Sequence, residues 1–345
     1  MSVDLARELI EAGLAADPAE IEELHRTDGP AVITACCRAR ARLIWIEHEH
    51  RLAGRVAEHR HVVAALNTVL QQAGLRDLVV LPTIGERATA IYPGLPASSL
   101  LVDALLPGRP LAIGPQQLRA VCRELARHLA RLHATPRATL PHALLRDSPA
   151  LHTVMELVAR RRGAAPATLG LEAVQELLTC ERHQLAEALA SACGRFDQCA
   201  DSVLLHGRFC PGFVVATAKG DVADLRIIGW TAAAFGPAEF DLGWCVGELE
   251  ELAKARQPAD AVGAQLLRGA GGELVRAYLR ECPAADPLRV ARECGAYAAV
   301  KVVAHLAEYA RYFAIDRSEA DAQLALAERL IEPAWAARLL AGEAQ

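Results

Sequence analysis

The chain has 345 residues, 52% of them hydrophobic, and a formal net charge of −5 at neutral pH. This length and composition predict a globular protein with one large core or two ordinary ones. The weak negative charge gives no field that would attract nucleic acid or an anionic membrane surface, so we discount both partners. Because no apolar run reaches the roughly 18 residues of a membrane span and the N-terminus lacks a signal-peptide core, we expect a cytoplasmic protein.

The cysteines favour a reduced protein without structural zinc. Ten are spread along the chain, and none forms a CxxC unit. In a cytoplasmic chain of this length they are expected to be free thiols that serve as small core residues. Lysine is confined to Lys219, Lys254 and Lys301 among many arginines and alanines, which suggests a bacterial genome rich in G and C.

The first hundred residues predict a small mixed lobe. Residues 3–13 have helical spacing, and Asp17-Pro18 is expected to open a second short helix that ends near Leu24. The β-branched runs at 30–37 and 42–48 predict a hairpin. A helix over 51–73 and strands over 78–84 and 87–93 follow.

Helical periodicity dominates after residue 250. The spacing of apolar residues predicts helices over 259–280, 287–313, 317–330 and 333–341. Earlier, the Gly-Ala-Ala-Pro stretch at 163–166 indicates a loop between helices.

Four stretches between residues 80 and 250 carry recognisable motifs. They read LLVDALLPGRPL (100–111), LARHLARLHATP (125–136), VLLHGRFCPGF (203–213) and IIGWTAAAFGPAEFDLGW (227–244). Their order and spacing resemble those of the aminoglycoside phosphotransferase and choline kinase family. There the corresponding stretches usually read (V/L)LMEWLPGxPL, LxxLHxxP, HGDxxxxN and (I/L)(I/D)W…FG(D)PxxDL.

The resemblance implies an α+β, two-lobed, protein-kinase-like fold. A small β-containing lobe would cover residues 1–100, a hinge 101–111 and a mostly helical lobe 112–345. The helical lobe would contain the catalytic loop (203–213) and the metal-binding segment (227–244).

The residues that would perform phosphoryl transfer are replaced in this chain. Arg208 stands where the family has its catalytic Asp, Phe213 replaces the metal-binding Asn, and Gly229 replaces the metal-binding Asp. A guanidinium has no lone pair with which to accept a proton, and magnesium needs hard oxygen ligands. We therefore predict a kinase fold without kinase chemistry and without a catalytic residue.

The small lobe also lacks phosphate-binding groups that the resemblance implies. The family places a Lys on the third strand, but no Lys precedes Lys219. Arg38, Arg40 and Arg42 alternate along the hairpin and would share one strand face as a substitute, although a solvated face is the favoured interpretation. The phosphate loop at 27–33 has one Gly, followed by Pro30, which cannot donate an amide hydrogen.

The surviving residues predict a ligand-binding cleft made of His206, Arg208, Trp230, Asp241 and Arg42. Trp230 would pack beneath the loop that His206 begins, and Asp241 would cap a helix that starts near Leu242. Arg208 would favour an anionic ligand such as a phosphate or a carboxylate.

Two other constellations are weaker. Residues His48, Glu49, His50, His59 and His61 could suggest a metal site, but consecutive residues of a strand point to opposite faces. His206 and Cys210 fix no nucleophilic geometry across a Pro-containing loop.

We interpret the chain as a pseudokinase that acts as a binding or scaffolding subunit and needs no cofactor. Its partner would be an enzyme or a precursor peptide with an anionic or phosphorylated group. Relatives of the family occur in bacterial lanthipeptide and thioamitide pathways. One alternative is an active phosphotransferase that uses ATP and magnesium through displaced carboxylates: Asp201, Asp221, Asp224 or Asp241. Another is an enzyme that has reused the cleft for different chemistry.

Overall fold

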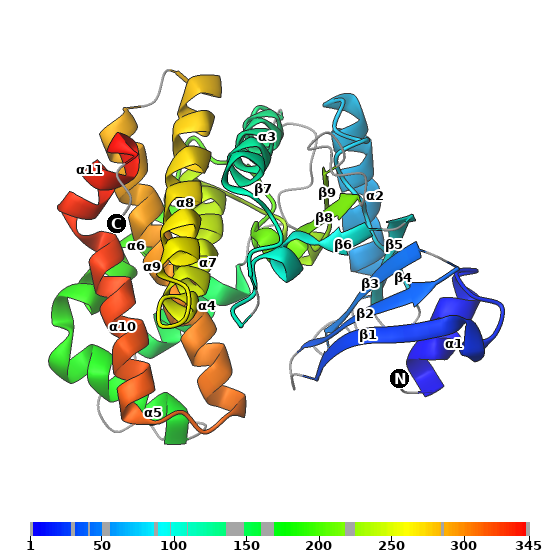
Figure 1. The fold of residues 1–345 in the computed structure, drawn as a ribbon, viewed down its shortest axis with the longest axis horizontal. Helices are drawn as coiled ribbons and strands as arrows, with labels where there is room; N and C mark the ends of the chain where they lie inside the picture. Colours follow the sequence, from blue (N-terminus) through cyan, green and yellow to red (C-terminus); the bar gives the residue numbers. More distant parts are fainter. Residues whose placement is uncertain are drawn as a thin grey trace. The chain divides into compact units, whose positions relative to one another are not determined.

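The computed structural model describes residues 3–28, 32–40, 42–49, 56–85, 89–96, 98–108, 110–135, 148–159, 169–217, 225–283 and 286–342. The chain divides into two compact units, and the elements of each can be followed in Figure 1. Unit 1 comprises Met1–Asp103, Thr135–Leu144 and Gly212–Thr231. Unit 2 comprises Ala104–Ala134, Leu145–Pro211 and Ala232–Gln345.

A five-stranded antiparallel sheet forms the centre of unit 1. Its order is β1-β2-β3-β5-β4, with β1 at Ile21–Asp28, β2 at Val32–Ala39, β3 at Arg42–Glu49, β4 at Thr83–Ile84 and β5 at Thr89–Pro96. The predicted hairpin is confirmed, since β2 and β3 pair from Val32↔Glu49 to Ala39↔Arg42.

The sheet is amphipathic by strand alternation, so its two faces have different environments. Ile44 and Ile46 pack with Leu9 of helix α1 (Val3–Glu11) in a buried cluster. Leu43, Trp45 and Glu47 alternate with them and are buried at the opposite face. This second face is where unit 1 places its functional candidates.

Helix α2 and a second, smaller sheet complete unit 1. Helix α2 (Val56–Gln72), which lies within the helix expected over 51–73, buries Leu66, Val69 and Leu70. The three-stranded sheet has the order β6-β8-β9, with β6 at Ser98–Leu100, β8 at Val214–Thr217 and β9 at Leu225–Ile227.

Two predictions for this unit are wrong. The helix expected from Pro18 to Leu24 is only a 3-10 turn at Pro18–Glu20, because residues from Ile21 onward pair with β2 as strand β1. The strand expected over 78–84 is reduced to β4 and to one parallel bridge between Val79 and Ile227. In both cases long-range pairing, which local propensity does not report, decides the structure.

The arginines of the hairpin also differ from expectation. Arg38 lies on β2 and Arg42 on β3, while Arg40 lies in the turn between them with φ +49, so the three do not share one strand face. Arg38 pairs with Glu22 at 2.8 Å and Arg40 with Glu20 at 3.0 Å, all exposed. These ion pairs hold β1 against the hairpin.

Unit 2 is built mostly of helices. They are α3 (Pro115–His133), α4 (Pro149–Ala159), α5 (Leu169–Glu176), α6 (His183–Asp197), α7 (Glu239–Arg256), α8 (Ala261–Glu281), α9 (Pro287–Tyr312), α10 (Arg317–Ile331) and α11 (Pro333–Ala341). A π-helical turn at Leu177–Glu181 links α5 to α6, and β7 (Val203–Leu205) pairs with β10 (Ala234–Gly236). The described residues include no helix that is long and apolar enough to cross a membrane.

Helix α7 lies at the centre of unit 2. It packs against both α8 and α9, and buried residues occur all around it, which is typical of a core helix. Its first turn reaches the loop after β7, and this contact positions the functional candidates of unit 2.

Candidate functional site

In unit 2, a carboxylate holds the loop that follows β7. Asp241 is fully buried and accepts hydrogen bonds from the backbone N–H of His206 at 2.8 Å and of Gly207 at 2.9 Å. Gly207 has φ +84, and a Cβ there would lie 1.8 Å from the carbonyl oxygen of Ala232, so only glycine fits. The predicted N-cap role of Asp241 is wrong, because α7 begins at Glu239 and places this residue inside its first turn.

Asp241 is supported in turn by a buried histidine. His133, the last residue of α3, has Nε2 3.4 Å from the Asp241 carboxylate and Nδ1 3.0 Å from the Tyr278 hydroxyl. Because a carboxylate only accepts, Nε2 is the donor in the contact with Asp241. Burial raises the pKa of Tyr278 well above its ordinary range, so this residue stays a neutral donor. We call His133, Asp241 and Tyr278 the loop clamp.

Arg208 follows the clamped residues and occupies the position of the expected base. It is half-buried, and its backbone N–H donates to Nδ1 of His206 at 3.3 Å. A guanidinium at this place supplies positive charge and no proton acceptor. The predicted affinity of Arg208 for an anion stays a prediction.

In unit 1, the two expected metal-ligand positions are filled by one aromatic ring. Gly229 has φ +83, and a Cβ built on it would lie 2.2 Å from Cδ1 of Phe213. The backbone N–H of Ile228 donates to the Phe213 carbonyl at 2.9 Å, which fixes the two segments against each other. The space in which a side chain at 229 would begin is therefore occupied by the phenyl ring.

Trp45 of β3 extends this aromatic contact. Its ring meets that of Phe213 edge to face, with centroids 6.3 Å apart and an interplanar angle of 86°. Trp230 is also buried in unit 1, and its indole Nε1 donates to the Ile227 carbonyl at 3.1 Å. Trp45, Phe213 and Gly229 form what we call the aromatic plug.

A buried carboxylate lies beside Trp45 on the same face of β3. Glu47 is only 1% exposed and accepts hydrogen bonds from the hydroxyls of Tyr92 and Thr231, each at 3.1 Å. The sequence analysis missed Glu47, although a single acid in an apolar strand was a usable signal. Among the described residues of β3, the inner face thus offers Leu43, Trp45 and Glu47.

A small apolar hollow borders the aromatic plug. It measures about 10 Å³, roughly the volume of one water, whereas ligand pockets usually measure about 300–1,000 Å³. The lining residues are Leu43, Trp45, Val80, Tyr92, Pro93, Gly94, Val215 and Ile228. At this size the hollow itself cannot admit a ligand.

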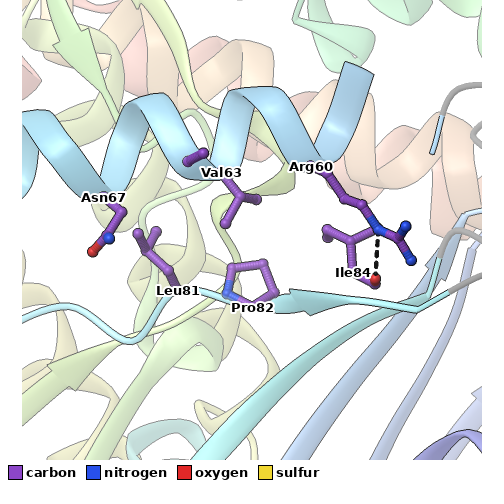
Figure 2. Close-up of a pocket in the computed structure, with 7 residues that line it drawn as sticks. Arg60, Val63, Asn67, Leu81, Pro82 and Ile84 are labelled. Carbon is purple, nitrogen blue, oxygen red and sulfur yellow. Dashed lines mark hydrogen bonds between the residues drawn. The ribbon is translucent and has the colours of Figure 1, made fainter. Parts of the chain in front are cut away.

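A larger hollow of about 290 Å³ in unit 1 lies between α2 and residues 81–84 (Figure 2). Arg60 stands at one end and donates from Nε to the Ile84 carbonyl at 3.1 Å, while Asn67 lies toward the other end. Val63 and Pro82 lie between them. This hollow shares no lining residue with the apolar one.

The described residues at the two expected metal-ligand positions do not fit a magnesium ion. Phe213 and Gly229 have no side-chain oxygen, and the ring of Phe213 fills the space at Gly229. Both oxygens of Asp241 accept backbone hydrogen bonds. Within the described ranges no three His, Cys, Asp or Glu side chains gather to hold a metal ion. We therefore derive no chemical step through a metal or a nucleotide.

The remaining predicted residues are dispersed. Arg42 is exposed at the start of β3, and Asp201 is exposed in a turn. His48 contacts the Thr89 hydroxyl at 3.0 Å through Nδ1, and Cys210 is buried. The candidates His50, Asp221 and Asp224, and the loop at 163–166, lie outside the described residues.

Comparison with known proteins identifies one family. The model of the phosphotransferase enzyme family (APH) matches residues 25–291. Among curated proteins, no sequence matches this chain significantly.

Solved structures of kinases are similar over nearly the whole chain. A choline/ethanolamine kinase family protein from Mesorhizobium loti is 16% identical, covers 98% of both chains and has a TM-score of 0.54. An ethanolamine kinase from Plasmodium vivax is 10% identical, with 94% of this chain and 84% of its own covered at a TM-score of 0.54. An amicoumacin kinase with AMP-PNP, Ca²⁺ and its substrate bound is 9% identical, with 100% and 95% covered at 0.58. Identities this low show a shared fold.

Proposed function

The chain belongs to the phosphotransferase enzyme family, with its kinase-like fold, and we propose that it is a member without phosphotransferase activity that acts by binding a partner. Phosphoryl transfer depends on positioning the nucleotide, the metal ions and the acceptor hydroxyl, so each lost group removes a defined function.

The observation that carries this proposal is the contact between Phe213 and Gly229. The family resemblance places two magnesium ligands at these positions. Here the phenyl ring lies where a side chain at 229 would start, 2.2 Å from its Cβ position, and it packs on Trp45 as well. An apolar contact thus replaces the two oxygen donors.

Three further features support the loss of activity. Arg208 cannot accept the proton of an acceptor hydroxyl. On the inner face of β3, the buried carboxylate of Glu47 disfavours phosphate groups nearby. The hollow beside Trp45 measures about 10 Å³ and cannot admit a ligand.

The loop clamp supports a binding role. His133, Asp241 and Tyr278 hold the backbone of residues 206 and 207 by buried hydrogen bonds, although the following residue has no catalytic group. A rigid loop that presents Arg208 suits recognition of a carboxylate or a phosphate. We infer that the partner is an enzyme or a precursor peptide with such a group, and that it belongs to a bacterial peptide-modification pathway of the lanthipeptide or thioamitide type.

Calorimetric titration with ATP and with GTP, each with and without magnesium, tests the loss of activity. We expect no binding heat and no nucleotide hydrolysis, while an active kinase of the family, titrated in the same buffers, gives both. Magnesium-dependent binding at micromolar strength would overturn the proposal. It would favour the alternative of an active phosphotransferase with displaced carboxylates.

Co-purification tests the binding role separately. The protein, expressed with the products of its neighbouring genes, is expected to retain one of them on a size-exclusion column. Failure to co-elute with every such product would count against a scaffold.

A further inference from the structure

Helix α3 carries an arginine at every fourth position, so these side chains follow one side of the helix with a small rotation at each step. These residues are Arg119, Arg123, Arg127 and Arg131, all exposed. Helix α8 packs alongside α3 in unit 2 (Figure 1) and adds Arg276 and Arg280. We call these six residues the arginine ridge.

Among the described residues, three carboxylates pair with four members of the ridge. Glu273 is shared by three of its members, at 3.6 Å from Arg123, 3.3 Å from Arg276 and 3.3 Å from Arg280. Glu124 and Glu281 both pair with Arg127. The described part of the chain gives Arg119 no acidic partner. The ridge is therefore a local excess of positive charge on a chain whose net charge is −5.

A groove opens between α3 and α8 at one end of the ridge. Its volume is about 410 Å³, and its lining combines charged residues with apolar ones. Arg119, Glu273 and Arg276 supply the charge, while Leu118 and Leu266 supply apolar surface. Val262, which also lines the groove, is 70% exposed.

The groove is open because α8 carries a glycine at its wall. No heavy atom lies within 4 Å of the Cβ position of Gly269. A larger side chain there would project into free space and reduce the groove without displacing its neighbours.

From the ridge and the groove together we propose that the α3–α8 face is a docking site for an acidic peptide segment that also carries apolar side chains. Glutamates or aspartates of the segment pair with the guanidinium groups, which bind carboxylates through two parallel hydrogen bonds. An apolar side chain of the segment enters the groove beside Val262 and Leu266. The inference rests on the binding role proposed above but not on the loss of nucleotide binding.

Charge and shape favour a peptide over a nucleic acid. None of the residues that line the groove is aromatic, so no base finds a stacking partner there. The negative net charge of the chain also opposes a long polyanion outside the ridge.

A displayed library of random 12-residue peptides, selected on the full chain, tests the proposal. We expect enrichment of sequences with several acidic residues and at least one large apolar residue. The most enriched peptide, labelled with fluorescein, is then titrated by anisotropy at two salt concentrations, and its affinity is expected to fall as salt rises.

Two variants with matched controls locate the site. Gly269→Leu blocks the groove, and Gly194→Leu on α6 is its control, because that Cβ position also has no atom within 4 Å. Arg119→Glu reverses one charge of the ridge, and Arg292→Glu makes the same change at an exposed position of α9. We expect each site variant to weaken binding at least tenfold and each control to leave it within twofold. Thermal melting should show all four proteins folded.

Three results would overturn the proposal. The first is enrichment of neutral or basic peptides, or of none. The second is equal binding by Gly269→Leu and Gly194→Leu. The third is tighter binding of a labelled single-stranded DNA 20-mer that competes for the same face and is lost in Gly269→Leu. None of these depends on the nucleotide titration, so the two proposals fail separately.

Discussion

Positions 213 and 229 constrain each other through one contact. The φ of +83 at Gly229 disfavours any side chain, and the Phe213 ring occupies the place where its Cβ would lie. The ring is itself held by Trp45, so it cannot turn away without losing an edge-to-face contact. At the aromatic plug, the metal-binding side chains are therefore not simply missing, because packed aromatic rings occupy their place.

Gly229→Asp alone should destabilise the protein by about 2–4 kcal/mol, because overpacking and backbone strain add. The double variant with Phe213→Ala lacks the ring. Its loss of unfolding free energy should be smaller than the sum of the two single losses by at least about 1 kcal/mol. Urea unfolding measures all three variants. Gly114→Asp is the control, since Gly114 precedes α3 with φ −74 and has open space at its Cβ position. Strictly additive values for the pair would show that the contact is not formed.

The sequence shows which motif residues are substituted, but it does not show how the substituted side chains pack. Arg208, Phe213 and Gly229 are visible by their place in the motifs. The packing of Phe213 on Gly229 and Trp45 is not visible, because it depends on how distant segments meet. The hydrogen bond between Glu47 and Thr231 joins residues 184 positions apart, so no local pattern predicts it.

A buried ion cluster joins helices α7 and α9. Lys301 of α9 is almost fully buried and contacts the carboxylates of Glu248 and Glu251 on α7, and Nδ1 of His305 lies 3.1 Å from Glu251. Burial lowers the pKa of Lys301, but the two carboxylates outweigh it and hold that pKa above its ordinary value. Burial would raise the pKa of Glu251, but Lys301 and His305 bring it below its usual value.

Lys301→Met should destabilise the protein by about 3–5 kcal/mol at pH 7, because the partly buried carboxylates of Glu248 and Glu251 lose their buried cation. In the native protein the pKa of Glu251 is lowered, which stabilises the fold at every pH above the pKa that Glu251 has in the unfolded chain. This stability is lost as the pH falls through the folded pKa. In the variant, Glu251 keeps its burial but loses Lys301, so that cation no longer holds its pKa down and protonation relieves the penalty. The deficit should therefore narrow from pH 7 to about pH 4.5 in urea unfolding.

Lys254→Met on α7 is the matched control, since Lys254 is only half-buried. It should cost less than about 1 kcal/mol, as partly exposed charges usually do. An equal loss of unfolding free energy in Lys301→Met and Lys254→Met would contradict a stabilising role for the contacts of Lys301 with Glu248 and Glu251.

Helices whose apolar residues recur with helical spacing were predictable from the sequence. Strands that form only by pairing with a distant strand were not. The predicted helices at 259–280 and 287–313 match α8 and α9 to within two residues, because apolar spacing marks their buried faces. Strand β1 was missed because Glu22, Glu23 and His25 give no strand signal and only pairing with β2 extends them. A 3-10 turn at Pro18 supplied a false helix start.

Over the whole molecule, cysteine is used as a core residue. All ten thiols are free, seven of them buried and three half-buried, as expected from their spacing. Burial raises the pKa of Cys36, Cys122 and Cys193 to about 12 and that of Cys37 to about 11. Thiols held in their neutral form react slowly with electrophiles.

Iodoacetamide at pH 8 should therefore modify the native protein rapidly at no more than three positions, namely the half-buried residues Cys180, Cys199 and Cys282. Intact mass spectrometry counts the additions, and unfolding in urea should raise the count to ten. Rapid modification of more than three thiols in the native protein would show that the cores are less closed than described.

The aromatic plug also has a consequence for the history of this lineage. While Phe213 is present, an Asp at 229 harms folding, and while Gly229 is present, an Asn at 213 restores no metal site. No single substitution at either position therefore builds a metal site from the present state. Such a site is expected to arise here only by changes at both positions together.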